Sequence, residues 1–241
     1  MTTYTPALGR FAPTRFYDSV VALTRERLWR ALTVMHVAPR AGETIVDVGC
    51  GTGSLIATIN RVEPRARVVG VDPDPEMLAI AERRADARWL TGMGDSLVAS
   101  LGPESADTVV SSLVLHQCPM TAKRAILREM AAVLRPEGRL VIADYGLQRT
   151  RSMRLAFRAV QFADGREDTQ PHADGLLPEL ITLAGFADVR EKEVVSTATG
   201  SISIYVAGLS KTLGESGGEE VGALTLPDHL DGGRGGTVRG G

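Results

Sequence analysis

Hydrophobic residues follow two alternating spacings along the chain. Continuous apolar runs, which are typical of strands buried on both faces, occur at residues 44–48, 67–71, 88–90, 107–115 and 139–145. Between these runs the apolar residues recur every three or four positions, which predicts helices at residues 54–62, 75–85 and 121–135. The last of these helices stops at a turn signal, Pro136-Glu137-Gly138. Such alternation favours a parallel sheet covered by helices on both faces.

The pattern continues on both sides of this region. An amphipathic helix is predicted ahead of the first strand, at residues 18–35. After the fifth run the sequence predicts a helix, a polar loop and a second helix, at residues 149–162, 163–175 and 176–185. Two β-rich runs that join at Gly200 predict a final hairpin, at residues 188–197 and 201–209.

The helix at 149–162 has two different faces. Arg151, Arg154 and Arg158 share one face, and apolar residues share another. We interpret it as a cap whose apolar face closes over an active site. The alternative is a helix that lies on an anionic membrane and presents a lipid substrate.

Composition separates the end of the chain from the rest. The chain has 241 residues with 27 Lys and Arg, 29 Asp and Glu, and a net charge of −2. Residues 211–241 contain ten glycines, 3 basic and 5 acidic residues, so we predict a disordered tail. Residues 1–210 are predicted to form one α/β domain that carries no net charge. A neutral domain argues against a nucleic-acid binder, which needs a basic surface.

Cysteine content and hydropathy narrow the class of protein further. Two cysteines, Cys50 and Cys118, form neither a disulfide framework nor a four-ligand zinc site, and no other metal cluster is evident. No apolar run approaches the ~18 residues of a membrane span, and the first residues lack the apolar core of a secretory signal. These features predict a soluble cytoplasmic protein. They do not indicate its oligomeric state.

The segment from Asp47 to Ser54 carries the strongest chemical signal. A strand leads into glycines at 49, 51 and 53 and then into a helix, so a ligand can approach the backbone there. A dinucleotide fingerprint would place the third glycine at 54. The carboxylate of Asp47 would repel a pyrophosphate, but it could help to hold an ammonium group directly or through water.

A second acid completes this signal. Asp72 closes the next strand, 23 residues after Gly49, which is close to the ~20 residues expected for an acid that binds ribose hydroxyls. The predicted ligand therefore has a ribose diol and an amino-acid end. S-adenosylmethionine is the common metabolite that meets both conditions.

Four segments in this order resemble one enzyme family: VDVGCGTGSL, GVDPDPEML, DTVVSSLVLHQ and LREMAAVLRPEGRLVIADY. Over residues 15–210 the chain resembles the class I S-adenosylmethionine-dependent methyltransferases, in particular the ubiquinone/menaquinone C-methyltransferase-like small-molecule enzymes. The resemblance implies a doubly wound, mostly parallel seven-stranded α/β sheet. Its last hairpin would add the one antiparallel strand.

The resemblance also implies a role for each cofactor-binding residue. Around the methionine end of S-adenosylmethionine it places Asp47, Gly49, Gly51 and Gly53, with Tyr17 and Asp18 near the carboxylate. Asp72 would bind the ribose, and Pro73 and Met77 would lie near the adenine. Ser111 and Ser112 would line the path to the substrate. Where many relatives have Gly-Asp-Ala, this chain has Gly92-Met93-Gly94-Asp95, so either Asp95 or Met93 would meet the adenine.

The predicted function is methyl transfer from S-adenosylmethionine to a small-molecule or lipid-like acceptor. His116 follows the fourth strand, so it is either the general base or a structural core histidine. Asp144 and Tyr145 end the fifth strand and point toward the same cleft, whereas His172 is expected in a solvated loop. Cys50 is expected to pack beneath the cofactor rather than to act as a nucleophile. The alternatives are a protein that binds S-adenosylmethionine without turnover and an NAD(P) dehydrogenase.

The predicted role of Asp72 can be tested by substitution. In Asp72→Ala, affinity for S-adenosylmethionine should fall at least about tenfold, because a charge-assisted hydrogen bond to the ribose is lost. Calorimetric titration measures this change. Unchanged affinity would remove Asp72 from the site.

Overall fold

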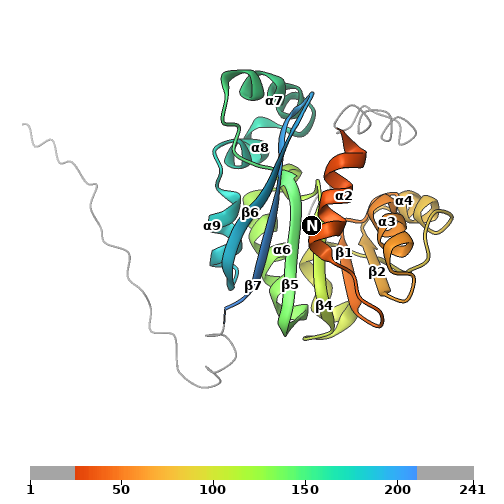
Figure 1. Ribbon diagram of the computed structural model, residues 1–241. Coiled ribbons are helices and arrows are strands. Elements are labelled where there is room, and N and C mark those ends of the chain that lie inside the picture. The colour runs from red at the N-terminus through yellow and green to blue at the C-terminus, as the bar shows by residue number, and fades with distance from the viewer. Residues whose placement is uncertain (1–24, 211–241) are drawn as a thin grey trace, which may run out of the picture.

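A computed structural model of the protein describes residues 25–210, in which seven strands form one sheet (Figure 1). The strands are β1 (Thr44–Val48), β2 (Arg67–Asp72), β3 (Arg88–Thr91), β4 (Ala106–Ser112), β5 (Leu134–Tyr145), β6 (Phe186–Thr197) and β7 (Gly200–Leu209). Their order in the sheet is β3-β2-β1-β4-β5-β7-β6. Only β7 runs antiparallel to its neighbours, β5 and β6, so the predicted doubly wound sheet with one antiparallel strand is confirmed.

Helices cover both faces of this sheet. Those whose apolar residues join the first buried cluster are α2 (Glu26–Val37), α3 (Ser54–Val62), α4 (Pro75–Ala81) and α7 (Arg151–Asp164). The second cluster, on the opposite face, takes residues from α5 (Leu97–Leu101), α6 (Met120–Val133) and α9 (Leu177–Leu183). Helix α8 (Arg166–Ala173) adds Ala173 to the first cluster, and the 3₁₀ turn η4 (Leu115–Gln117) adds Leu115 to the second. A further 3₁₀ turn in residues 25–210 is η3 (Gly94–Ser96).

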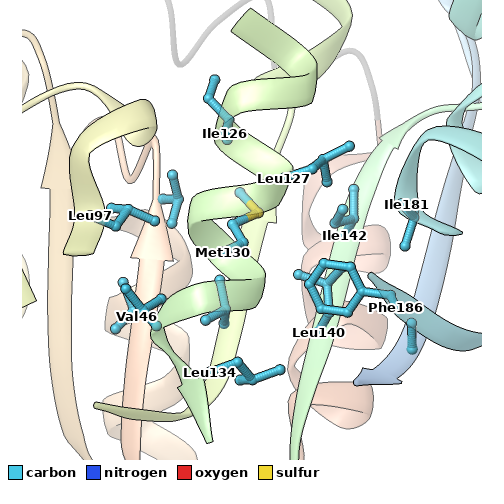
Figure 2. Close-up of a cluster of buried hydrophobic side chains, with 14 of the residues drawn as sticks. Val46, Leu97, Ile126, Leu127, Met130, Leu134, Leu140, Ile142, Ile181 and Phe186 are labelled. Atoms are coloured by element: carbon cyan, nitrogen blue, oxygen red, sulfur yellow. The ribbon is translucent and has the colours of Figure 1, made fainter. Parts of the chain in front are cut away.

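Strand pleating explains why the central strands are apolar on both sides. In β5, Val141 joins the first cluster, while Leu140 and Ile142 join the second. Figure 2 shows Leu140 and Ile142 facing Leu127 and Met130 of α6. A parallel sheet that is buried in this way leaves only its strand ends for a ligand site.

Most predicted elements occupy the expected residues, but the fourth strand is shorter than expected. It ends at Ser112 instead of continuing to 115. Leu113 turns the chain with φ of 56°, and the next residues form η4. The reason is tertiary: the backbone N–H groups after the turn donate to the carboxylate of Asp144, so they are not available to a strand.

The segment predicted as a polar loop, 163–175, contains a helix instead. Helix α8 has few apolar residues, but Thr169, His172 and Ala173 are buried on its inner side. This packing, rather than any amphipathic pattern, stabilises the helix. His172 is therefore buried and not solvated, which corrects the expectation for that residue.

The turn signal at 136–138 also behaves differently from the prediction. Helix α6 ends at Val133, and β5 begins at once, with Leu134 paired to Ala106. The next paired residue of β5 is Arg139, opposite Thr108, so the turn residues form an irregularity inside the strand.

Three predictions fall outside the described residues: Tyr17 and Asp18, the start of the helix at 18–35, and the tail at 211–241. Within residues 25–210, no helix has the length and hydrophobicity needed to span a bilayer.

Truncating a core leucine tests the second buried cluster. Leu127 is fully buried, so Leu127→Ala should lower the free energy of unfolding by about 2–5 kcal/mol through lost burial and a residual cavity. Leu183→Ala is the matched control, because that leucine is 67% exposed and its loss should cost under about 0.5 kcal/mol. Urea unfolding measures both, and equal effects would contradict this description of the core.

Candidate active site

The C-terminal ends of four parallel strands meet at one edge of the sheet. Val48 of β1 pairs with Val71 of β2 on one side and with Ser111 of β4 on the other. Asp72 of β2 pairs with Thr91 of β3. Sequence segments that are far apart along the chain are therefore brought together, and the predicted cofactor residues within 25–210 lie at or just beyond this edge.

The glycine turn after β1 is held against the end of β2. The N–H groups of Gly49 and Cys50 donate to the carbonyl of Val71 at 2.8 and 3.1 Å. A Cβ added at Gly49 would lie 2.3 Å from the Val114 side chain, whereas one at Gly51 would meet no atom within 4 Å. Gly51, with φ of 51°, therefore borders open space, where a ligand can approach the backbone.

The Asp72 carboxylate braces this turn. One oxygen accepts the N–H of Gly51 at 2.8 Å, and the other accepts the N–H of Asp74 at 2.9 Å. Burial raises the pKa of Asp72, and these two backbone bonds oppose the rise. Each carboxylate oxygen keeps a further lone pair for a ligand hydroxyl, so Asp72 can shape the turn and bind a diol.

Asp47 is a buried acid without a partner. It is 0% exposed, and neither carboxylate oxygen has a hydrogen-bond partner in the described structure. Burial and the nearby charge of Asp72 raise its pKa to about 7, while Arg30 of α2 opposes the rise. A buried carboxylate without a partner is costly, so this position favours a cationic ligand group.

The other predicted cofactor residues differ in how much of their surface is available. Met77 of α4 is buried, and Pro73, Met93, Gly94 and Asp95 are half-buried near the ends of β2 and β3. A Cβ on Gly94 would lie 2.8 Å from Val48, so this glycine is required by packing. Ser111 is buried and donates its hydroxyl to the carbonyl of Val48 at 2.8 Å, and Ser112 is half-buried.

Cys50 lies inside the turn, and its environment makes it unreactive. The side chain is buried in the first apolar cluster. Burial, followed by the negative charges of Asp47 and Asp72, raises the pKa of its thiol. A thiol that stays protonated is a poor nucleophile.

A second polar cluster lies at the ends of β4 and β5. Asp144 is almost fully buried, and one of its oxygens accepts the N–H groups of Val114, Leu115 and His116 at 3.2, 2.8 and 3.3 Å. The other oxygen faces Nδ1 of His116 at 2.7 Å and accepts the N–H of Tyr145 at 2.7 Å. Asp144 therefore holds both the turn after β4 and the imidazole.

Helix α7 supplies a second carboxylate to the same imidazole. Asp164, the last residue of α7, places one oxygen 3.5 Å from Nε2 of His116. Its other oxygen is buried and has no hydrogen-bond partner in the part of the chain that the structure describes. His116 is thus flanked by carboxylates from β5 and α7.

Lys123 of α6 is fully buried beside this cluster. Its ammonium donates to the carbonyls of Cys118 and, at 2.7 Å, Asp168, and lies 3.5 Å from the carbonyl of His116. Three acceptors match the three N–H groups of an ammonium, and one of them belongs to α8. Burial lowers the pKa of Lys123.

The two buried histidines have opposite pKa shifts. Burial alone would lower the pKa of His116, but Asp144 and Asp164 outweigh it and raise the pKa to about 9. The Nδ1–H group of His172 donates to the carbonyl of Tyr145 at 2.8 Å, and burial lowers the pKa of His172 to about 4. His116 is therefore charged at neutral pH and His172 is neutral. Burial would also raise the pKa of Asp144, but His116 holds it at about 2.

Lys123 and Asp164 are not recognised by the sequence-based reasoning, although a signal for both is present. Lys123 is spaced four and seven residues from Leu127 and Met130, so it falls on the apolar face of its helix. Asp164 follows Phe157 and Val160 at seven and four residues in the same way. A charged residue on the buried face of a helix is a sign of a buried polar partner.

Comparison with known proteins matches this region to one family. A family model described as a methyltransferase domain covers residues 45–138. The chain is 35% identical over 121 residues to a ubiquinone/menaquinone biosynthesis C-methyltransferase of Rubrivivax gelatinosus, covering 49% of this chain and 46% of that protein. The chain therefore spans about half the length of this relative. It is 32% identical over 190 residues to a malonyl-[acyl-carrier protein] O-methyltransferase of Dechloromonas aromatica, covering 78% of this chain and 67% of that protein.

Solved structures share the fold. A magnesium protoporphyrin IX methyltransferase from Synechocystis, with S-adenosylhomocysteine bound, has a TM-score of 0.60 at 19% identity and covers 81% of this chain and 88% of its own. An S-adenosylmethionine-dependent methyltransferase from Aquifex aeolicus has a TM-score of 0.58 at 16% identity and covers 83% of this chain and 100% of its own. Together with the long match to the Dechloromonas enzyme, these similarities mean that the chain belongs to the class I S-adenosylmethionine-dependent methyltransferases.

Proposed function

We propose that the chain transfers a methyl group from S-adenosylmethionine to a small-molecule or lipid-like acceptor. The observation that carries the proposal is the fully buried carboxylate of Asp47, which has no hydrogen-bond partner within residues 25–210, beside the open backbone at Gly51. One relative is named as a ubiquinone/menaquinone biosynthesis C-methyltransferase and another as a malonyl-[acyl-carrier protein] O-methyltransferase. These names support a small acceptor group, but they differ in the methylated atom.

The residues at the strand ends fit this cofactor. The carboxylate of Asp47 would balance the positive charge of the cofactor's ammonium group. The open side of Gly51 would receive the methionine end of the cofactor. Asp72 keeps lone pairs for the ribose hydroxyls. Pro73 and Met77, together with either Met93 or Asp95, would contact the adenine.

S-adenosylmethionine supplies a methyl group on a positively charged sulfur, which is already strongly electrophilic. The chain must therefore mainly align the acceptor and exclude water. We propose that His116 does not serve as a base at neutral pH, because its two ring nitrogens face carboxylates and its pKa is about 9. In this role it is a positioning residue that links β5 to α7.

A protein that binds S-adenosylmethionine without turnover is the alternative, and one observation favours it. The polar cluster at the ends of β4 and β5 is covered, since His116 of η4 and His172 of α8 are both buried. Formation of S-adenosylhomocysteine in the presence of a demethylated quinol or a malonyl thioester distinguishes the two functions.

The pH dependence of cofactor binding tests the role of Asp47. Below pH 7 the carboxyl group is mostly protonated, and a bound ammonium favours the carboxylate, so binding should release a proton. Affinity for S-adenosylmethionine should rise about fivefold from pH 6 to pH 7, a range below the ordinary pKa of the ligand amine. Calorimetry in buffers of different ionisation enthalpy measures both quantities.

Matched variants make this test specific. Asp47→Asn should weaken binding about tenfold or more at pH 7 and remove the pH dependence. Asp188→Asn is the control, because that aspartate is exposed at the start of β6 and should bind as the wild type does. Tight binding of NADH with no binding of S-adenosylmethionine would overturn the proposed function.

The charge state of His116 has a consequence for stability. Its pKa is raised from 6.5 to about 9, so its contribution is fully present below pH 6.5 and is lost as the pH rises to 9. Over this interval the wild type should lose roughly 2–3 kcal/mol of unfolding free energy relative to His116→Gln. Urea unfolding of both proteins at pH 6.5 and 9 measures the difference, and parallel pH profiles would contradict a charged His116.

A further inference from the structure

Helix α7 presents two large apolar side chains to solvent. Its inner side packs Phe157 and Val160 into the first buried cluster. On its outer side, Leu155 is 64% exposed and Phe162 is 94% exposed. Figure 1 shows the helix at the top of the molecule, beside the turn between β6 and β7, so this side lies at an end of the domain.

The exposed apolar residues share a surface with arginines. At about 100° per residue, Arg151, Leu155, Arg158 and Phe162 fall within roughly 60° of the helix circumference, and Arg154 lies about 40° further on. Together these five residues form what we call the outer face of α7. Phe157 and Val160 lie on the opposite side of the helix.

The outer face carries the positive charges of three arginines that form no ion pair with an acidic side chain in residues 25–210. Arg151 and Arg158 form no ion pair within residues 25–210, and Arg154 donates Nε to the carbonyl of Gln148 at 2.9 Å rather than to a carboxylate. The one acid of α7, Asp164, lies on the inner side next to His116. Three guanidinium groups therefore surround two exposed apolar side chains.

This combination favours a lipid surface over a protein partner. A stable protein interface has an apolar core made of several buried side chains, whereas this face offers only two apolar residues, Leu155 and Phe162. A membrane surface needs only a few inserted apolar groups together with cations that meet its phosphates. The positive charge selects anionic headgroups.

We propose that the outer face of α7 docks the protein on an anionic lipid bilayer. Leu155 and Phe162 enter the headgroup region, and the three arginines meet lipid phosphates. The inner side of the same helix reaches His116 through Asp164, so the docked surface lies next to the strand-end cluster. The proposal concerns a surface outside the cofactor site, and it does not require the proposed methyl transfer to be correct.

Vesicle sedimentation with the full chain tests the proposal. The protein should bind vesicles made of equal parts phosphatidylcholine and phosphatidylglycerol, should bind pure phosphatidylcholine at least about tenfold more weakly, and should be released by added sodium chloride. The double variant Leu155→Ser/Phe162→Ser and the double variant Arg151→Gln/Arg158→Gln should each lose about tenfold or more of the affinity. Leu183→Ser, which removes a leucine that is 67% exposed on α9, should bind as the wild type does.

Two further measurements distinguish lipid binding from dimerisation of the chain, and from a failure of the proposed methyl transfer. If the outer face instead joins two copies of the chain, the wild type will dimerise without lipid and the Leu155→Ser/Phe162→Ser variant will not, which would overturn the proposal. Equal vesicle binding by wild type and both double variants would also overturn it. S-adenosylmethionine affinity should be unchanged in these variants, so a failure of vesicle binding is distinguishable from a failure of the proposed function.

Discussion

A buried carboxylate needs partners, and this requirement organises the strand-end edge of the sheet. Asp144 obtains all its partners from the protein: three backbone N–H groups after β4, the N–H of Tyr145 and the imidazole of His116. Asp47, two strands away, obtains no hydrogen-bond partner from residues 25–210. Asp144 therefore has a structural role, because loss of its carboxylate would leave several hydrogen-bond donors without an acceptor. Asp47 is incomplete within the described chain, and a cationic ligand group is the partner that its position requires.

The cluster around His116 connects three layers of the molecule. Asp144 belongs to the sheet, Lys123 to α6 on one face, and Asp164 to α7 on the other. Two basic side chains, His116 and Lys123, and two acidic ones, Asp144 and Asp164, are thus matched in number although the cluster is buried. Such compensation is the condition under which charges are tolerated away from water. It also fixes the end of α7, so the two faces of that helix cannot rotate freely: one is held at the strand ends and the other, with Leu155 and Phe162, remains outside.

Periodicity located most elements because it reports directly on burial. The strand at 44–48 and the helix at 54–62 have the predicted bounds, since the strand is apolar apart from Thr44 and Asp47 and the helix has a clear apolar face. Periodicity gave the wrong element where tertiary contacts determine the backbone conformation. The residues after Ser112 look like a continued strand, but Asp144 captures their N–H groups. Helix α8 has almost no apolar pattern and is held by buried contacts of Thr169 and His172.

The sequence by itself determined the fold class, the glycine turn and the two acids Asp47 and Asp72, because these depend on local spacing and on strands whose ends must meet at one edge. Only the tertiary structure decided which polar groups are satisfied. Within residues 25–210, Asp72 accepts two backbone N–H groups, Asp47 accepts none, and His116 lies between two carboxylates. These facts concern residues up to 48 positions apart in the chain. Burial and charge at such a site arise from packing between elements: spacing along one helix can mark a buried charged residue, but it does not identify the partner on another element.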